Sequence, residues 1–200
     1  MKLLLTSAGL STEKIKKEFL KLIGRPTKEI KILFIPTAGN LKNDKSYIER
    51  DKNDLIRLGI LKENLIEYDL DRINENIDFE DIDAIFIEGG NTFYLLKRVR
   101  ETGFDKKIID LVKRGVVYIG VSAGSILAGP NIETASPFDN NITNLKDLTS
   151  LNLTSLIISP HFTNKNEIKI KQLENESKYK LIRLTDSQAL LIINNKIKVI

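Results

Sequence analysis

Short apolar runs rich in β-branched residues alternate along this chain with stretches of helical periodicity. Runs of this kind, with almost no polar interruption, are typical of parallel strands whose sheet is covered by helices on both faces. We therefore predict an α/β fold, a three-layer sandwich around a mostly parallel central sheet. The expected strands are residues 2–6, 31–36, 65–69, 84–87, 116–121 and 156–159, followed by a closing hairpin of 189–193 and 196–200 that turns through Asn194 and Asn195.

The stretches between the strands carry helix signals. The first, residues 12–23, places Ile15, Phe19 and Leu22 on one face and follows Ser11, a candidate N-cap. The further helices are expected at 47–58, closed by Gly59, at 92–100, capped by Asn91, and at 105–114 and 122–128. Residues 136–147 are polar and predict a surface loop. Because no boundary interrupts this pattern, we expect a single domain over residues 1–200.

The composition limits the classes of protein to consider. Of the 200 residues, 42% are hydrophobic and 29% are charged, which is typical of a globular domain. No apolar run approaches the roughly 18–20 residues that span a bilayer, and the apolar part of the first seven residues is too short for a signal peptide. The chain has no cysteine, which excludes disulfides, thiolate metal sites and a cysteine nucleophile and fits a cytoplasmic protein.

Charge and histidine content argue against further classes. The net charge is only +4 and the lysines are interleaved with acidic residues, so we expect neither a nucleic-acid nor a membrane partner. A single histidine leaves only carboxylates as further metal ligands, and these lack the spacing of a ligand cluster, so neither a metal nor a cofactor is expected. The sequence leaves the oligomeric state open, with a homodimer as one option.

In a parallel α/β sheet, functional sites form where the strands reach their carboxyl ends. Gly89, Gly90 and Asn91 follow one expected strand, where glycine lets the backbone approach a substrate closely and an amide can face an oxyanion. The same residues also fit a plain strand-to-helix turn with an asparagine cap, and both interpretations can hold at once.

The sequence Gly120-Val121-Ser122-Ala123-Gly124 matches the pattern G-x-S-x-G between a buried strand and a helix. A sharp turn at this point lifts the serine hydroxyl off the sheet and directs the amide of Ala123 toward a developing oxyanion. Ser122 is therefore the candidate nucleophile. The alternative is a turn of small residues that packs a helix against the sheet.

A serine nucleophile needs a base, and His161 is the one histidine in the chain. It follows another expected strand, so we predict that it takes the proton of Ser122. A third residue, a carboxylate, would orient the imidazole. Asp139 and Glu133 both lie between serine and histidine, and we favour Asp139 because it lies in an irregular loop that can fold back over the site.

Three blocks follow one another in order along the chain: 86–96, Phe-Ile-Glu-Gly-Gly-Asn-Thr-Phe-Tyr-Leu-Leu; 120–124, Gly-Val-Ser-Ala-Gly; and 158–163, Ile-Ser-Pro-His-Phe-Thr. Together they resemble the dipeptidase E and cyanophycinase-like serine peptidases, and the likeness spans nearly the whole chain. The resemblance implies a class I glutamine-amidotransferase-like sandwich with serine in place of cysteine at the turn. It implies an enzyme that hydrolyses small peptides through an acyl-enzyme, with Ser122 as nucleophile, His161 as base and the amides of Gly90 and Ala123 as oxyanion hole.

Two departures from the family pattern bear on the site. The aspartate that follows the serine helix in those dipeptidases corresponds to a position near Pro137, so Asp139 is displaced by two residues. The segment after the histidine supplies an arginine in the aspartyl dipeptidases, whereas residues 164–180 contain lysines but no arginine, so aspartate specificity is not expected to carry over. The alternatives that stay open are a non-catalytic binding module with an incomplete triad and an esterase or other acyl hydrolase.

Overall fold

A computed structural model describes residues 1–73, 77–194 and 196–200 of the chain. Within these residues, seven strands form the central sheet in the order β3-β2-β4-β5-β1-β8-β9. The first five in this order run parallel to one another, and β8 and β9 are antiparallel to their neighbours. Their bounds are β1 (Lys2–Thr6), β2 (Ile32–Ile35), β3 (Leu65–Glu67), β4 (Ala84–Ile87), β5 (Val117–Val121), β8 (Ala189–Ile193) and β9 (Lys196–Val199). The predicted α/β fold with a mostly parallel sheet is confirmed.

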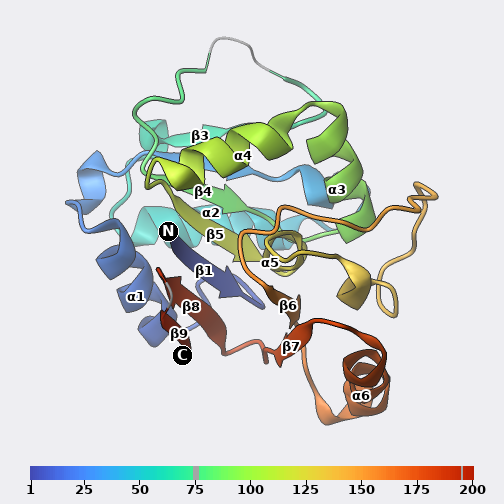
Figure 1. Cartoon of the computed structure of the whole chain (residues 1–200). Helices are drawn as coiled ribbons and strands as arrows, with labels where there is room; N and C mark the ends of the chain where they lie inside the picture. Colours follow the sequence, from blue (N-terminus) through green and yellow to red (C-terminus); the bar gives the residue numbers. More distant parts are fainter. Residues whose placement is uncertain (74–76, 195) are drawn as a thin grey trace.

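Helices cover both faces of this sheet (Figure 1). Alternate residues of each strand point to opposite faces, so Leu3 and Leu5 join one core while Leu4 joins the other. The helices α1 (Glu13–Ile23) and α2 (Ser46–Arg57) pack in the second core, and α3 (Thr92–Glu101), α4 (Phe104–Lys113) and α5 (Ala123–Leu127) pack in the first. Short 3₁₀ turns occupy η1 (Thr27–Glu29), η2 (Thr37–Gly39), η3 (Lys62–Asn64), η4 (Glu133–Ala135) and η5 (Asn164–Asn166).

A second, small sheet lies beside the first. β6 (Leu156–Ser159) pairs in parallel with β7 (Lys180–Arg183), and α6 (Glu167–Glu176) connects them at the lower right of Figure 1. The sequence led us to expect β6 in the central sheet, which is wrong, and β7 was not predicted. The residues of β7 are only half-buried and include charged side chains, so they lack the apolar pattern of the other strands.

The ends of the elements follow the sequence signals with one correction. Asn91 caps α3, as predicted, and Gly59 adopts a φ of +97° after α2. The N-cap of α1 is Thr12 rather than Ser11, because the Thr12 hydroxyl accepts a hydrogen bond from the N–H of Ile15. The hairpin between β8 and β9 is present, and Asn195 of its predicted turn lies outside the described residues.

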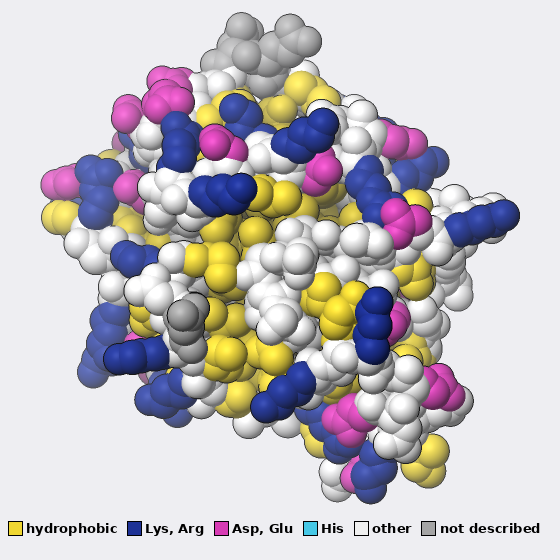
Figure 2. All heavy atoms as spheres, in the orientation of Figure 1, with side chains coloured by type: hydrophobic (Ala, Val, Ile, Leu, Met, Phe, Trp, Pro, Cys, Tyr) yellow, Lys and Arg dark blue, Asp and Glu magenta, His cyan; other side chains and the backbone are white. Residues whose placement is uncertain are grey.

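The surface carries both kinds of charge side by side. Figure 2 shows Lys and Arg side chains spread among Asp and Glu over this face of the molecule, with hydrophobic side chains between them. Several surface ion pairs join residues one helical turn apart, such as Lys16 with Glu13 and Lys97 with Glu101. None of the helices in the described ranges is both long and apolar enough to cross a membrane.

Candidate active site

Ser122 lies at the turn between β5 and α5, with a φ of +47° and a ψ of −103°. This backbone conformation is rare for a residue with a side chain. Two glycines make the turn sterically feasible. A Cβ at Gly120 would lie 2.5 Å from the carbonyl oxygen of Gly124, and a Cβ at Gly124 would lie 2.2 Å from that of Ile87. The small residues of the motif therefore allow the helix to approach the sheet closely enough to form the turn.

His161 faces Ser122 across the edge of the sheet. Its Nε2 lies 2.9 Å from the Ser122 Oγ. The backbone of His161 also has a positive φ, +55°, and is held on both sides: its N–H donates to the Ser7 hydroxyl at 2.7 Å, and its carbonyl accepts from the Asn166 side chain at 2.8 Å. The histidine is thus fixed by Ser7, directly after β1, and by Asn166 of η5.

The other ring nitrogen of His161 contacts Asp186. Its Nδ1 lies 2.6 Å from Asp186 Oδ1, which also accepts a 2.8 Å hydrogen bond from the Ser7 hydroxyl. Burial opposes ionisation of this carboxyl, but the hydrogen bonds from Ser7 and His161 outweigh it and lower the pKa of Asp186. An ionised Asp186 holds the proton on Nδ1 and leaves Nε2 free to accept the proton of Ser122.

The hydrogen bond that we expected between Asp139 and His161 is therefore made by Asp186 instead. The Asp139 carboxylate lies at the start of α3, where its Oδ2 accepts from the Thr92 N–H at 2.9 Å and from the Thr92 hydroxyl at 2.7 Å. The N–H of Asp139 also donates to the carbonyl of Ala135 at 2.8 Å, so the backbone of Asp139 is held in a turn that begins at Ala135. Glu133, the other carboxylate considered, accepts a hydrogen bond from Ser177.

Sequence reasoning missed Ser7 and Asp186. Ser7 directly follows β1 and is fully buried, and Asp186 lies in the turn between β7 and β8. Both obey the rule that sites form at strand ends. The signal at Asp186 was hidden because β7 was not recognised as a strand.

The predicted glycine loop lies next to Ser122. A Cβ added to Gly89 would lie 3.2 Å from the Ser122 Cβ and 3.8 Å from its Oγ. Gly90 has a φ of +148°, and a Cβ there would lie 2.0 Å from the carbonyl oxygen of Ala38. Only glycine fits at this position, and the loop consequently packs directly on the backbone of η2.

Two hydrogen bonds orient this loop. The Tyr47 hydroxyl donates to the Gly89 carbonyl at 3.1 Å, and the N–H of Asn91 donates to the Ala38 carbonyl at 2.8 Å. Because the carbonyl of Gly89 and the N–H of Gly90 belong to one trans peptide and point in opposite directions, Tyr47 also fixes the direction of the Gly90 N–H.

The side chain of Asn91, which we grouped with the substrate-binding residues, is occupied by structural contacts. Its oxygen accepts from the Tyr94 N–H at 2.9 Å, and its nitrogen donates to the Asn140 carbonyl at 2.9 Å. The Ala123 residue is buried at the first position of α5, beside Ser122.

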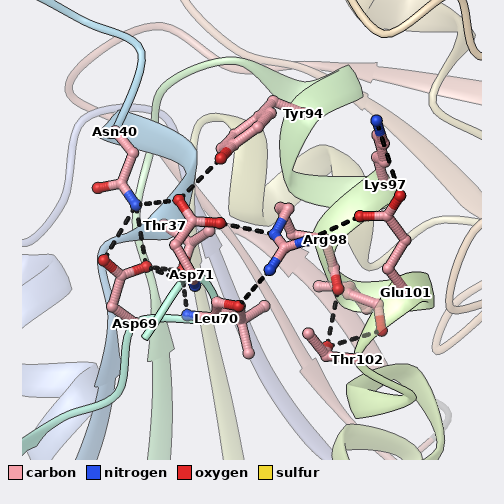
Figure 3. Close-up of polar contacts among 11 residues, drawn as sticks. Thr37, Asn40, Asp69, Leu70, Asp71, Tyr94, Lys97, Arg98, Glu101 and Thr102 are labelled. Carbon is pink, nitrogen blue, oxygen red and sulfur yellow. Dashed lines mark hydrogen bonds and ion pairs between the residues drawn. The ribbon is translucent and has the colours of Figure 1, made fainter. Parts of the chain in front are cut away.

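A polar network connects η2 to the segment after β3 and to α3 (Figure 3). The Thr37 hydroxyl donates to Asp69 at 2.9 Å, and the Asn40 amide donates to both Asp69 and Asp71. Asp71 in turn pairs with Arg98 of α3, with a 2.6 Å contact to the guanidinium Nε. The network ties η2 to the end of β3 and to α3, so the surface on which Gly90 rests is held in place.

A cavity of about 620 Å³ opens above Ser122. Its wall carries charges of both signs and one exposed aromatic ring. The lining includes Ser7, Lys42, Asp44, Tyr47, Arg50, Gly89, Gly90, Ser122, Phe138, Asp139, His161 and Asp186. Within the described part of the chain, no group of three or more acidic or histidine side chains could hold a metal ion.

A serine hydroxyl, an imidazole and a carboxylate joined by hydrogen bonds at the carboxyl edge of an α/β sheet form the arrangement found in serine hydrolases. Comparison with known proteins gives the family. The model of peptidase family S51 matches residues 3–200, and this chain belongs to that family. It is a peptidase, so the expected enzyme class and the resemblance to the dipeptidase E group are confirmed.

Individual relatives agree with this assignment. The Listeria monocytogenes protein named Uncharacterized peptidase Lmo0363 is 32% identical over 167 residues, which cover 80% of this chain and 81% of that protein. Peptidase E of Shigella flexneri is 39% identical over 132 residues, or 66% of this chain and 55% of that protein.

Solved structures share the fold. A crystal structure of a candidate Peptidase E protein from Listeria monocytogenes EGD-e superposes with a TM-score of 0.85 at 28% identity, covering 100% of this chain and 97% of the other. A peptidase from an acI-B1 Actinobacterium superposes with a TM-score of 0.68 at 19% identity, covering 100% and 86%. The second likeness concerns the fold alone.

Proposed function

We propose that this chain hydrolyses small peptides through an acyl-enzyme formed on Ser122, with His161 as general base and Asp186 as the orienting carboxylate. The observation that carries this proposal is the unbroken line of hydrogen bonds from Asp186 through His161 to Ser122, at 2.6 Å and 2.9 Å. These distances lie within the reach required for proton transfer between nucleophile and base.

The steps follow from the geometry. Neutral His161 takes the proton of the Ser122 hydroxyl as its Oγ attacks the scissile carbonyl, and then gives that proton to the leaving amine. Water, deprotonated by the same imidazole, then attacks the carbonyl of the acyl-enzyme. The bond from that carbonyl to Ser122 Oγ breaks, Oγ takes the proton back from the imidazolium, and the second product is released. Asp186 stays ionised throughout and stabilises the imidazolium, in agreement with its lowered pKa.

The turn at Ser122 acts as a nucleophile elbow in this proposal. The N–H of Ala123, at the start of α5, and the N–H of Gly90 form the oxyanion hole on either side of the serine. A Cβ at Gly89 would lie 3.8 Å from the Ser122 Oγ, so the backbone of the glycine loop runs next to the reacting oxygen. Donors fixed by the fold stabilise the developing charge without reorganising during the reaction.

The cavity supports a small substrate with charged ends. Lys42 and Arg50 can attract a terminal carboxylate, and Asp44 and Asp139 can attract an ammonium group. A dipeptide carries both groups within a few ångströms, and relatives of this chain are named Peptidase E. The argument for a non-catalytic module rested on the displaced carboxylate at Asp139, and Asp186 removes that argument.

The nucleophile is tested by Ser122→Ala. This change removes one oxygen from a turn held by backbone hydrogen bonds, so the protein is expected to stay folded and to lose dipeptide hydrolysis and labelling by a fluorophosphonate probe. Full hydrolysis by a folded Ser122→Ala protein would rule out the proposed mechanism.

Three further expectations from the sequence belong to the same proposal. The chain works as one catalytic domain over residues 1–200, it acts in the cytoplasm, and it has no nucleic-acid partner. The homodimer stays an option to be measured by the molar mass of the protein in solution.

A further inference from the structure

Two carboxyl groups lie buried beneath the glycine loop. Glu88 lies between the end of β4 and Gly89 and has no exposed surface, and Asp51 of α2 is 2% exposed. The two carboxyl groups lie close enough to interact directly, and the charge of each acts on the other. Neither group takes part in the proposed reaction.

One oxygen of each carboxyl has a donor and the other does not. Asp51 Oδ1 accepts from Arg50 at 2.9 Å, and Glu88 Oε2 accepts from the N–H of Gly89 at 3.1 Å. Asp51 Oδ2 and Glu88 Oε1 are buried and have no donor among the described residues. The backbone of Gly9 closes the space beside Asp51, since a Cβ there would lie 2.5 Å from Oδ2.

Two ionised carboxylates cannot satisfy this arrangement. A buried acceptor without a donor loses its hydration and gains no hydrogen bond in return, and two adjacent negative charges with little access to water repel each other strongly. One proton between the two oxygens gives each of them a hydrogen-bond partner and removes one of the two charges.

Resting on the function proposed above, we propose that Asp51 and Glu88 share one proton between Oδ2 and Oε1, and that this protonated pair positions the glycine loop for catalysis. The pair joins the two supports of that loop. Glu88 holds the N–H of Gly89, and Asp51 lies one helical turn after Tyr47, whose hydroxyl holds the carbonyl of Gly89. Loss of the proton separates β4 from α2 and loosens both contacts.

The surroundings favour the protonated form. Burial is the largest influence and raises the pKa of both carboxyls; the charge of Asp51 raises that of Glu88 further, and Arg50 and Lys52 oppose the rise without cancelling it. The other titratable groups that interact with the pair are Asp54 and Tyr47 on α2. Arg50 also acts on Asp186.

The sign of the pH effect follows. Because folding raises the pKa of the pair, the protonated pair contributes its full stabilisation of the fold below the ordinary carboxyl pKa. This stabilisation is lost as the pH rises through the raised pKa of the folded state. Turnover is therefore expected to fall on the alkaline side.

The first test does not depend on catalysis. In the Ser122→Ala protein, infrared spectra in heavy water at neutral pH are expected to show the C=O stretch of a protonated carboxyl, and Ser122→Ala with Glu88→Gln is expected to lack it. A spectrum without this band, or a band unchanged by Glu88→Gln, overturns the shared proton. If the Glu88→Gln protein does not fold, the test is made on Ser122→Ala alone by raising the pH. The band is then expected to disappear, and a band that persists to pH 10 overturns the proposal.

The second test measures the positioning role through the shape of the kcat–pH profile. The wild type is expected to lose about tenfold in kcat per pH unit above the pKa of the pair, and Glu88→Gln is expected to lack this alkaline limb whatever its absolute rate, because an amide does not ionise. The ratio of the two rates at each pH cancels any titration of the substrate amine. Asp51→Asn is the second variant, with the same expectation, and Glu80→Gln, on an exposed residue, should keep the wild-type limb. The same alkaline fall in kcat in all variants overturns the positioning role. Hydrolysis by the Ser122→Ala protein would instead overturn the proposed function, and it would not affect the infrared test of the shared proton.

Discussion

At the residue scale, two side chains at the centre of this site, Ser122 and His161, sit on backbone with positive φ. Such conformations cost about 1–3 kcal/mol each, and here the neighbours that hold them are visible. The N–H of Ser122 donates to the Thr6 carbonyl at 3.0 Å, and His161 is held by Ser7 and Asn166. The strain is offset by bonds to the end of β1, which makes that strand end part of the site.

The identity of the orienting carboxylate is a prediction at this scale. Asp186→Asn keeps the size of the side chain but removes the charge that stabilises the imidazolium, so kcat is expected to fall by roughly 10⁴ with a smaller effect on KM. Glu133→Gln is the matched control, because its carboxylate contacts Ser177 rather than His161 and does not line the cavity. Equal losses in the two variants would argue against Asp186 as the orienting group.

Tyr47 carries a second residue-scale prediction. Burial, followed by the negative charge that the Glu88–Asp51 pair retains, raises the pKa of Tyr47 to about 12, so its hydroxyl remains a donor to Gly89 at any working pH. Tyr47→Phe removes that donor and is expected to lower kcat about tenfold, the equivalent of one hydrogen bond of roughly 1.4 kcal/mol, with KM little changed. Tyr179→Phe, in the segment before β7, serves as control. A Tyr47→Phe enzyme with wild-type kcat would show that the glycine loop keeps its orientation without the hydroxyl.

At the scale of elements, the site is formed by strand ends and the turns that follow them. β4 leads into the glycine loop, β5 into Ser122, β6 into His161 and the turn before β8 into Asp186. η2 supports the glycine loop, and the Thr37–Asp69–Asp71–Arg98 network supports η2 (Figure 3). The catalytic geometry thus depends on contacts between elements more than on any one of them.

The packing of the glycine loop on η2 gives a prediction for Gly90→Ala. The added Cβ would lie 2.0 Å from the Ala38 carbonyl, so the loop must move and hydrolysis is expected to be lost in a protein that still folds. Gly103→Ala is the matched control. Gly103 also has a positive φ, +67°, but a Cβ there would have nothing within 4 Å, so the change should cost about 1 kcal/mol of stability without loss of activity. Circular dichroism and kcat measured on both proteins decide whether contact with η2, rather than backbone strain, is responsible.

At the scale of the whole molecule, the two cores on either side of the sheet hold these elements in register. Leu3, Leu5 and Tyr118 belong to one core and Leu4 and Phe86 to the other. Small shifts of the sheet relative to its helices would therefore change the distances among Ser122, His161 and Asp186 together.

A prediction at this scale concerns how the free energy of unfolding depends on pH. Burial alone would raise the pKa of Asp71, but hydrogen bonds from Asn40 and Tyr94 and the charge of Arg98 outweigh it and lower the pKa. A carboxylate whose pKa is lowered by folding stabilises the folded protein at any pH above the ordinary carboxyl pKa. This stabilisation is lost as the pH falls through the pKa of the folded state. Asp71→Asn is expected to lower the free energy of unfolding by about 1–2 kcal/mol at pH 7, with the difference shrinking toward pH 3. Denaturant unfolding at both pH values measures it, and a difference independent of pH would show that the charge of Asp71 contributes nothing.

The sequence by itself determined the layers of this molecule and two of its central side chains. The apolar runs marked the strands of the central sheet because their side chains are buried on both faces, and G-x-S-x-G marked Ser122 because the sharp turn requires small residues at Gly120 and Gly124. His161 could be singled out because it is the only histidine in the chain. Local patterns of this kind are readable wherever a backbone conformation restricts the residues that can adopt it.

Tertiary structure alone decided the rest. Asp186 reaches His161 only because β7 pairs with β6 outside the central sheet, and neither the half-buried residues of β7 nor the turn at 184–188 carries a pattern that reveals this pairing. Asp139, which the order of residues along the chain favoured, is drawn to the N–H and hydroxyl of Thr92 at the start of α3. A carboxylate can satisfy its charge with any donor within reach, so its partner depends on which elements pack against it and not on its neighbours in the sequence.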